Sequence, residues 1–318
     1  MNNSEPRRLI KFGNSSFVVS LPKDWIEKNN LSKGDIVYLE NLDDVIVLSS
    51  KNKKKNSVKT NVTINTDNGN QKDIRREASS AYINNYDELI FEGKDRKKRV
   101  ETVNYITSGR IGLEVVDQNE NQSIVRDILD LNAISFEKIT RRLDNIIRSM
   151  FEDLREMLGG GNFSELNNDL KNADGEVNKL YFLIWKIIRK CQENPQIAKE
   201  MKISLKELSN MQWLSLHMEY MGDEIKGLAS LMSLVKADEK CKKKILESIK
   251  ILEQDYLKAL GAYYSNDRQI ARKIASMRDI HRNICIKFFT ACPSSGAISE
   301  KMRGIANCIH NIAKIVAY

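Results

Sequence analysis

Two carboxylates, Glu219 and Asp223, have a spacing that could hold a metal ion. Residues four apart share one face of a helix, and carboxylate oxygens are hard ligands for cations. Asp174 and Glu176 lie on a neighbouring expected helix and are further candidate ligands. The sequence therefore offers a site for a divalent or trivalent metal ion, or else an exposed acidic face opposite lysines.

Histidines and cysteines near the C-terminus offer a second set of candidate ligands. His281 and Cys285 lie one helical turn apart, and three more follow: Cys292, Cys308 and His310. Zinc takes such ligands, but the spacings are irregular and Cys285 and Cys308 fall near a buried stripe, which favours packing. The five cysteines stand singly, and we expect them to be thiols in a reducing compartment. His217, beside Glu219, could be a ligand or a pH-sensitive cap.

The sequence indicates no catalytic machinery. It contains no Gly-rich phosphate loop, no HExxH motif and no nucleophile elbow, and the local sequence motivates no catalytic Ser/His/Asp or Cys/His arrangement. We therefore expect a protein that is not an enzyme and requires no cofactor. A metal-dependent enzyme built on Glu219 and Asp223 is the alternative.

The sequence contains three further clusters of basic residues that could bind an anion. Arg75–Arg76 and Arg96–Arg99 could hold an anion, although on helices beside a sheet such runs are more often exposed faces. The Lys-rich segment 51–56 could track phosphates and is expected to be a solvated linker.

The composition indicates a soluble chain of several domains with long helices. Of 318 residues, 41% are hydrophobic and 30% charged, and 51 Lys+Arg against 43 Asp+Glu give a net charge of +8. Only 4 Pro and 15 Gly interrupt the elements. No apolar run approaches the ~20 residues of a membrane span, and the N-terminus lacks a secretory stretch. We expect a cytoplasmic protein without membrane insertion.

Residues 1–50 have the pattern of a small β-rich domain. Apolar residues alternate with polar ones on both sides of a turn at Gly13–Ser16, Pro22 opens a short helix, and residues 36–39 and 45–48 form a second strand pair. Because so few large apolar residues make a poor core, this domain is expected to need a partner chain.

The run from Arg8 to Trp25, RLIKFGNSSFVVSLPKDW, followed by Leu31–Asp35, resembles the swapped-hairpin DNA-binding domain of the AbrB, SpoVT and MazE families. The resemblance implies a homodimer in which two chains interleave hairpins into one β-barrel that binds double-stranded DNA. It implicates basic and polar residues in that contact: Arg7, Arg8, Lys11, Asn14, Ser15, Ser16 and Lys23. The alternative is a dimerisation module whose charges only keep it soluble.

Residues 57–120 alternate strand and helix patterns and predict a small α/β domain. Residues 121–318 are helical nearly throughout, with apolar spacings of three and four and a first helix expected from 123 to 158. Breaks divide this region into two three-helix bundles, at 121–236 and 237–318. The fold class is therefore multi-domain α+β.

The two bundles have the pattern of a duplication. Met218–Ser233 aligns without gaps on Met302–Ala317, with apolar positions in phase. This repeat, with the run EYMGDEIKGLA from Glu219, resembles the PhoU family, whose acidic motif can bind metal ions. The second copy departs from the motif, because Arg303 and Asn307 replace the two acids.

Together with Ala78–Asp87, these features are similar to archaeal phosphate uptake regulators that join an AbrB-like domain to a PhoU-like tail. The resemblance implies a DNA-binding transcriptional regulator of phosphate homeostasis. The alternative is an adaptor that docks on a phosphate transporter ATPase or a sensor kinase and has no DNA role.

Overall fold

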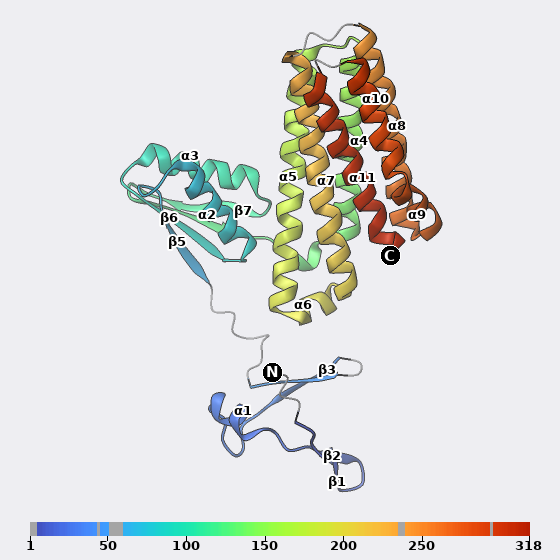
Figure 1. The fold of residues 1–318 in the computed structure, drawn as a ribbon. Coiled ribbons are helices and arrows are strands. Elements are labelled where there is room, and N and C mark those ends of the chain that lie inside the picture. Colours follow the sequence, from blue (N-terminus) through green and yellow to red (C-terminus); the bar gives the residue numbers. More distant parts are fainter. Residues whose placement is uncertain (1–4, 43–44, 51–59, 235–238, 293–294) are drawn as a thin grey trace. The chain divides into compact units, whose positions relative to one another are not determined.

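The computed structural model describes residues 5–42, 45–50, 60–234, 239–292 and 295–318, and the chain divides into two units, Met1–Lys59 and Thr60–Tyr318 (Figure 1). We call residues 5–50 the head. The expected Lys-rich linker at 51–56 lies outside the described residues.

The head contains two hairpins and a short helix. β1 (Ile10–Phe12) pairs antiparallel with β2 (Ser16–Val18), and β3 (Tyr38–Leu42) pairs with β4 (Val45–Ser49). α1 (Lys23–Lys28) begins directly after Pro22. The Ser50 hydroxyl donates to Asn29 Oδ1 at 2.9 Å and so ties the end of α1 to the end of β4. In this single chain the hairpins form separate two-stranded sheets, so the barrel expected from the resemblance is not closed by the described residues.

The second unit begins with a mixed four-stranded sheet in the order β5-β6-β8-β7. β6 runs parallel to β5, and β8 runs antiparallel to both of its neighbours. The core between sheet and helices is built on fully buried Ile64, Tyr82, Phe91 and Ile106. The elements are β5 (Asn61–Asn65), α2 (Gln71–Ile83), β6 (Glu88–Glu92), α3 (Arg96–Gly109), β7 (Leu113–Gln118) and β8 (Gln122–Asp127).

The helix expected from residue 123 was wrong in its first turns. Residues 122–127 form β8, and the helix α4 (Phe136–Leu158) starts only after a 3-10 turn at Leu131–Ala133. Ser123 and Val125 are fully buried and alternate with less buried neighbours, which is the period of a strand. The expected domain boundary at 120/121 therefore falls inside the β7–β8 hairpin.

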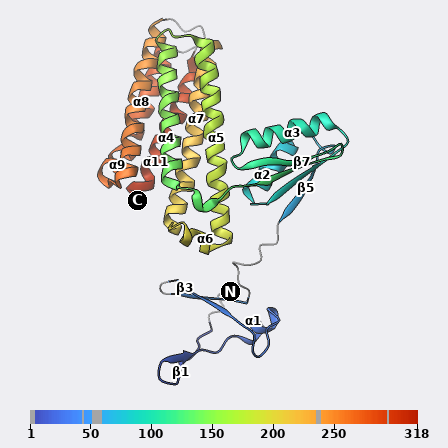
Figure 2. The same ribbon diagram turned by 180° about the vertical axis from the view of Figure 1, so that it is seen from behind.

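Seven further helices follow α4 in the described residues. α4, α5 and α7 pack together, α8, α10 and α11 pack together, and α7 lies against α11. Figure 2 shows α4 and α8 side by side. No described helix combines the length and apolarity needed to cross a membrane. The helices are α5 (Phe163–Glu193), α6 (Pro195–Glu200), α7 (Leu205–Leu234), α8 (Glu239–Ser265), α9 (Arg268–Ser276), α10 (Arg278–Ala291) and α11 (Gly296–Ala317).

The repeated segments form the centre of this helical region. Met221 and Ile225 of α7 and the matching Ile305 and Ile309 of α11 are all fully buried. One continuous core joins both groups of three helices. The apolar positions that match between the two segments thus form the buried faces of α7 and α11, and these helices pack against each other.

A buried polar contact joins the α/β domain to the helices. Lys186 of α5 is 1% exposed, and its Nζ lies 2.7 Å from Asp127 Oδ2 and donates to the Tyr82 carbonyl at 3.2 Å. Asn85 donates to the Lys186 carbonyl at 3.2 Å. Burial lowers the pKa of Lys186, and Asp127 opposes this effect. The ion pair therefore fixes α2 and β8 on α5.

Candidate functional site

The β1–β2 hairpin carries the cations that the sequence implicates in DNA binding. Lys11 stands opposite Phe17 in the ladder, and Arg8 precedes β1. Both are exposed, and within the described residues neither makes a salt bridge. These two charges are therefore available to a phosphate backbone.

The other two predicted cations are already paired. Arg7 donates to Glu5, and Lys23 lies 3.4 Å from Glu27 on α1. Their contribution to an anionic ligand is reduced, since each carries its own counter-charge.

The predicted polar residues lie at the tip of the hairpin. Asn14 and Ser15 are in the turn, and Ser16 begins β2; all three are exposed. Gly13 opens the turn with a φ of +70°, a conformation that glycine adopts without strain. The structure thus brings Lys11, Asn14, Ser15 and Ser16 together on one hairpin.

The described residues of the head form no buried core of their own. None of the side chains between residues 5 and 50 whose burial is described is buried, and large apolar side chains stand exposed on the strands, with Ile10 at 61%, Phe12 at 70% and Leu39 at 67%. A monomeric soluble protein rarely exposes so many contiguous apolar groups. This surface requires cover from another chain or segment.

The expected metal ligands of the helical region are arranged around a lysine. Lys226 Nζ lies 2.7 Å from Asp174 Oδ2 and 2.6 Å from Asp223 Oδ1. Burial raises the pKa of Glu219 to about 7, and the charges of Asp223 and Asp174 add to the effect. Three of the predicted residues therefore gather, with an ammonium group among them.

Glu176 does not join this cluster. It is held by Arg142 and Lys179, each at 2.7 Å. No group of three or more His, Cys, Asp or Glu side chains in the described part of the chain has an arrangement suited to a metal ion. In the second copy, Arg303 pairs with Glu300 at 2.7 Å. The geometry favours the alternative of an acidic face neutralised by basic residues.

Glu219 gives the first prediction. The pKa of Glu219 is about 7 in the folded protein and 4.5 in the unfolded chain. The folded protein therefore loses stability as the pH rises from 4.5 to 7, because the buried carboxyl must ionise. Because Glu219 is partly exposed, we expect Glu219→Gln to raise the free energy of unfolding at pH 8 by about 1–2 kcal/mol, with little change near pH 4. Urea denaturation at both pH values measures this, with the exposed Glu247→Gln as control; an equal change at both pH values would contradict it.

The candidate zinc ligands lie at separate places and make different contacts: a hydrogen-bonded histidine pair, buried thiols and a histidine stacked on a tryptophan. His281 bonds to Asp255 through Nε2 and to His310 through Nδ1, each at 2.8 Å, and the two rings stack. Cys285 and Cys308 are free thiols buried in the core. His217 stacks on Trp213. The interpretation of Cys285 and Cys308 as packing residues fits these positions.

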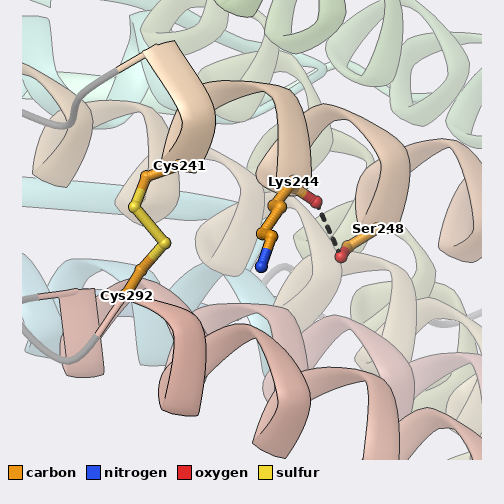
Figure 3. Close-up of a disulfide and its surroundings, with 4 residues drawn as sticks. All are labelled: Cys241, Lys244, Ser248 and Cys292. Carbon is orange, nitrogen blue, oxygen red and sulfur yellow. Dashed lines mark hydrogen bonds between the residues drawn. A yellow bond between two sulfur atoms is a disulfide. The ribbon is translucent and has the colours of Figure 1, made fainter.

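The expectation that all cysteines are thiols was wrong. Cys241, near the start of α8, and Cys292, directly after α10, form a disulfide with Cα atoms 6.1 Å apart (Figure 3). Short motifs such as CxxC cannot reveal this pair, because α8 and α10 bring together residues that are distant in the sequence. The disulfide removes Cys292 from the candidate zinc set.

The buried histidine pair gives a second prediction. Burial lowers the pKa of His310 to about 4, and His281 and Arg278 add to the effect. The unfolded chain takes up this proton at about pH 6.5, so the folded state loses up to about 3 kcal/mol as the pH falls from 6.5 towards 4. We expect His310→Gln to reduce that loss, as measured by denaturation at pH 7 and 4.5. Ser299→Ala on the same helix is the control, and an unchanged pH dependence in His310→Gln would refute the assignment.

The arginines of the two basic clusters in the α/β domain differ in burial and in their contacts. Arg99 is fully buried and donates to the carbonyls of Gly93, Asn119 and Glu120, so it serves the fold. Arg76 pairs with Asp73 at 3.2 Å, whereas Arg75 lies over the Tyr105 ring.

Comparison with known proteins bears on the head. Residues 10–56 match a family model described as antidote-toxin recognition MazE, bacterial antitoxin. No curated protein and no solved structure matches the chain. The match supports the expected MazE-like N-terminal domain, and the PhoU-like resemblance of the helical region stays a prediction.

Proposed function

We propose that this protein is a dimeric transcriptional regulator whose head binds double-stranded DNA. The observation that carries the proposal is the MazE match at residues 10–56, a segment whose described residues include free cations at a hairpin and form no buried core. Each feature is one that a swapped-hairpin DNA-binding domain needs.

The two faces of the first hairpin suit different partners. Side chains opposite each other in the ladder share a face, so Ile10, Phe12 and Val18 lie on one face and Lys11 and Phe17 on the other. The apolar face is suited to a second copy of the head, and the face with Lys11 is left for a polyanion.

We also propose that the helical region receives a phosphate-related signal through a bound partner. The support is the resemblance to PhoU and the repeat that α7 and α11 form at the centre of this region. A signal that changes the placement of two heads would change their fit to spaced half-sites on DNA.

Sedimentation and chromatin experiments test the proposal. The full chain is expected to sediment as a dimer, and Phe12→Asp to sediment as a monomer that has lost DNA affinity. Recovery of DNA crosslinked to the protein in cells grown at high and low phosphate is expected to show occupied sites that depend on phosphate. A monomeric full chain would count against the dimer. Capture of a transporter ATPase or a sensor kinase without any crosslinked DNA would favour the adaptor.

A further inference from the structure

A basic groove lies where the α/β domain meets the helical region. It has a volume of about 800 Å³ and is lined by residues of α2, the end of α3 and α5. α2 and α5 are neighbours in the structure (Figure 1). Its cationic lining is Lys72, Arg75, Arg76, Arg110 and Arg189.

Most of the cations in this groove are not paired with an acid in the described part of the chain. None of the lining residues is Asp or Glu. Arg76 pairs with Asp73, but within the described residues Lys72, Arg75, Arg110 and Arg189 make no salt bridge. Several unpaired cations around one concavity create a positive potential that favours an anion.

Arg110 is the strongest indication of a ligand. Only 5% of this residue is exposed, and it donates to Ser79 Oγ at 2.8 Å and to the Gly109 carbonyl at 2.6 Å. Its guanidinium lies 3.5 Å from the centre of the Phe182 ring, and its Nε meets no acceptor among the residues that the structure describes. A buried cation with neutral partners only is costly, and an anion in the groove would offset that cost.

The groove also offers aromatic surface. Trp185 and Tyr105 line it. A volume of about 800 Å³ exceeds what an inorganic phosphate fills and lies within the range of small-ligand sites. Cations beside aromatic rings are suited to a ligand that combines phosphate with a planar ring.

We propose that this groove binds a nucleotide. Lys72, Arg75 and Arg189 would contact the phosphates, with Arg110 behind them, and Trp185 would contact the base. All the residues of this groove belong to the second unit, so nucleotide binding and DNA binding by the head are tested independently.

Calorimetric titration of the full-length protein with ATP, GTP, CTP and UTP in turn tests the proposal. We expect at least one of them to bind with micromolar Kd and to change the fluorescence of Trp185, observed in a Trp25→Phe and Trp213→Phe background. Arg189 is exposed, so Arg189→Ala should fold normally and weaken that binding by about tenfold or more.

The controls separate this site from general attraction of anions. Arg96→Ala removes an exposed charge of the same domain outside the groove, and Arg8→Ala removes one from the head; both should leave nucleotide affinity unchanged. Tripolyphosphate should bind about tenfold more weakly than the nucleotide, because it has no base to contact Trp185. Absence of binding by all four nucleotides, equal binding of tripolyphosphate, or an equal loss in Arg96→Ala would overturn the proposal.

Discussion

Replacement of Lys186 by methionine is expected to destabilise the second unit by about 3–5 kcal/mol, the range for breaking a buried ion pair. The ammonium group is 1% exposed and contacts both the Asp127 carboxylate and the Tyr82 carbonyl. Without it, a largely buried carboxylate loses its counter-charge at the junction of the α/β domain with α5. Urea denaturation of the full-length protein measures the loss.

Two further variants establish the cause. Lys171→Met changes an exposed residue of the same helix and should cost less than about 0.5 kcal/mol. Addition of Asp127→Asn to Lys186→Met should recover part of the lost stability, since it removes the unpaired charge. Equal effects of Lys186→Met and Lys171→Met would show that the ion pair does not hold the junction.

Removal of both free cations of the first hairpin is expected to have the largest effect on DNA binding. Arg8→Ala with Lys11→Ala should weaken affinity at low salt by about tenfold or more, because the two unpaired charges no longer neutralise phosphates. It should also reduce the slope of log affinity against log salt by about four, because a dimer presents two copies of each cation. Fluorescence anisotropy over a salt series provides both values.

The matched control removes the same charge elsewhere. Arg96→Ala with Lys97→Ala lies on an exposed part of α3 and should leave affinity and salt slope unchanged. Arg7→Ala should have a smaller effect than Arg8→Ala, since Glu5 already pairs with Arg7. A double head variant with the parent's salt slope would exclude the hairpin as the DNA-binding element.

The sequence predicted the helices and strands whose apolar pattern is visible within a short stretch of residues. The β1–β2 hairpin follows from alternating residues around Gly13, and α2 follows from Ile74, Ala78 and Tyr82, which are all buried. β8 was missed because its alternation is short and precedes a long helical pattern. The buried positions Ser123 and Val125 carry the period of two that could have found it.

The candidate sites were less predictable because they depend on tertiary contacts. Helical spacing placed Glu219 and Asp223 on one face, but it gave no sign that Lys226 would lie between Asp174 and Asp223. The Cys241–Cys292 disulfide and the burial of Arg110 likewise depend on residues that are far away in the sequence. Lys186 did leave a signal, since it closes the longest apolar run, Leu180–Trp185.

The central claim is that the head binds double-stranded DNA. The most direct measurement compares the full chain with a chain that starts at Thr60, each titrated into labelled double-stranded genomic fragments at low ionic strength. The second unit has its own core, so the shorter chain retains the rest of the protein. We predict that the full chain binds with an affinity that falls steeply with salt and that the shorter chain does not bind. Equal binding by both chains, or no binding by the full chain, would contradict the account.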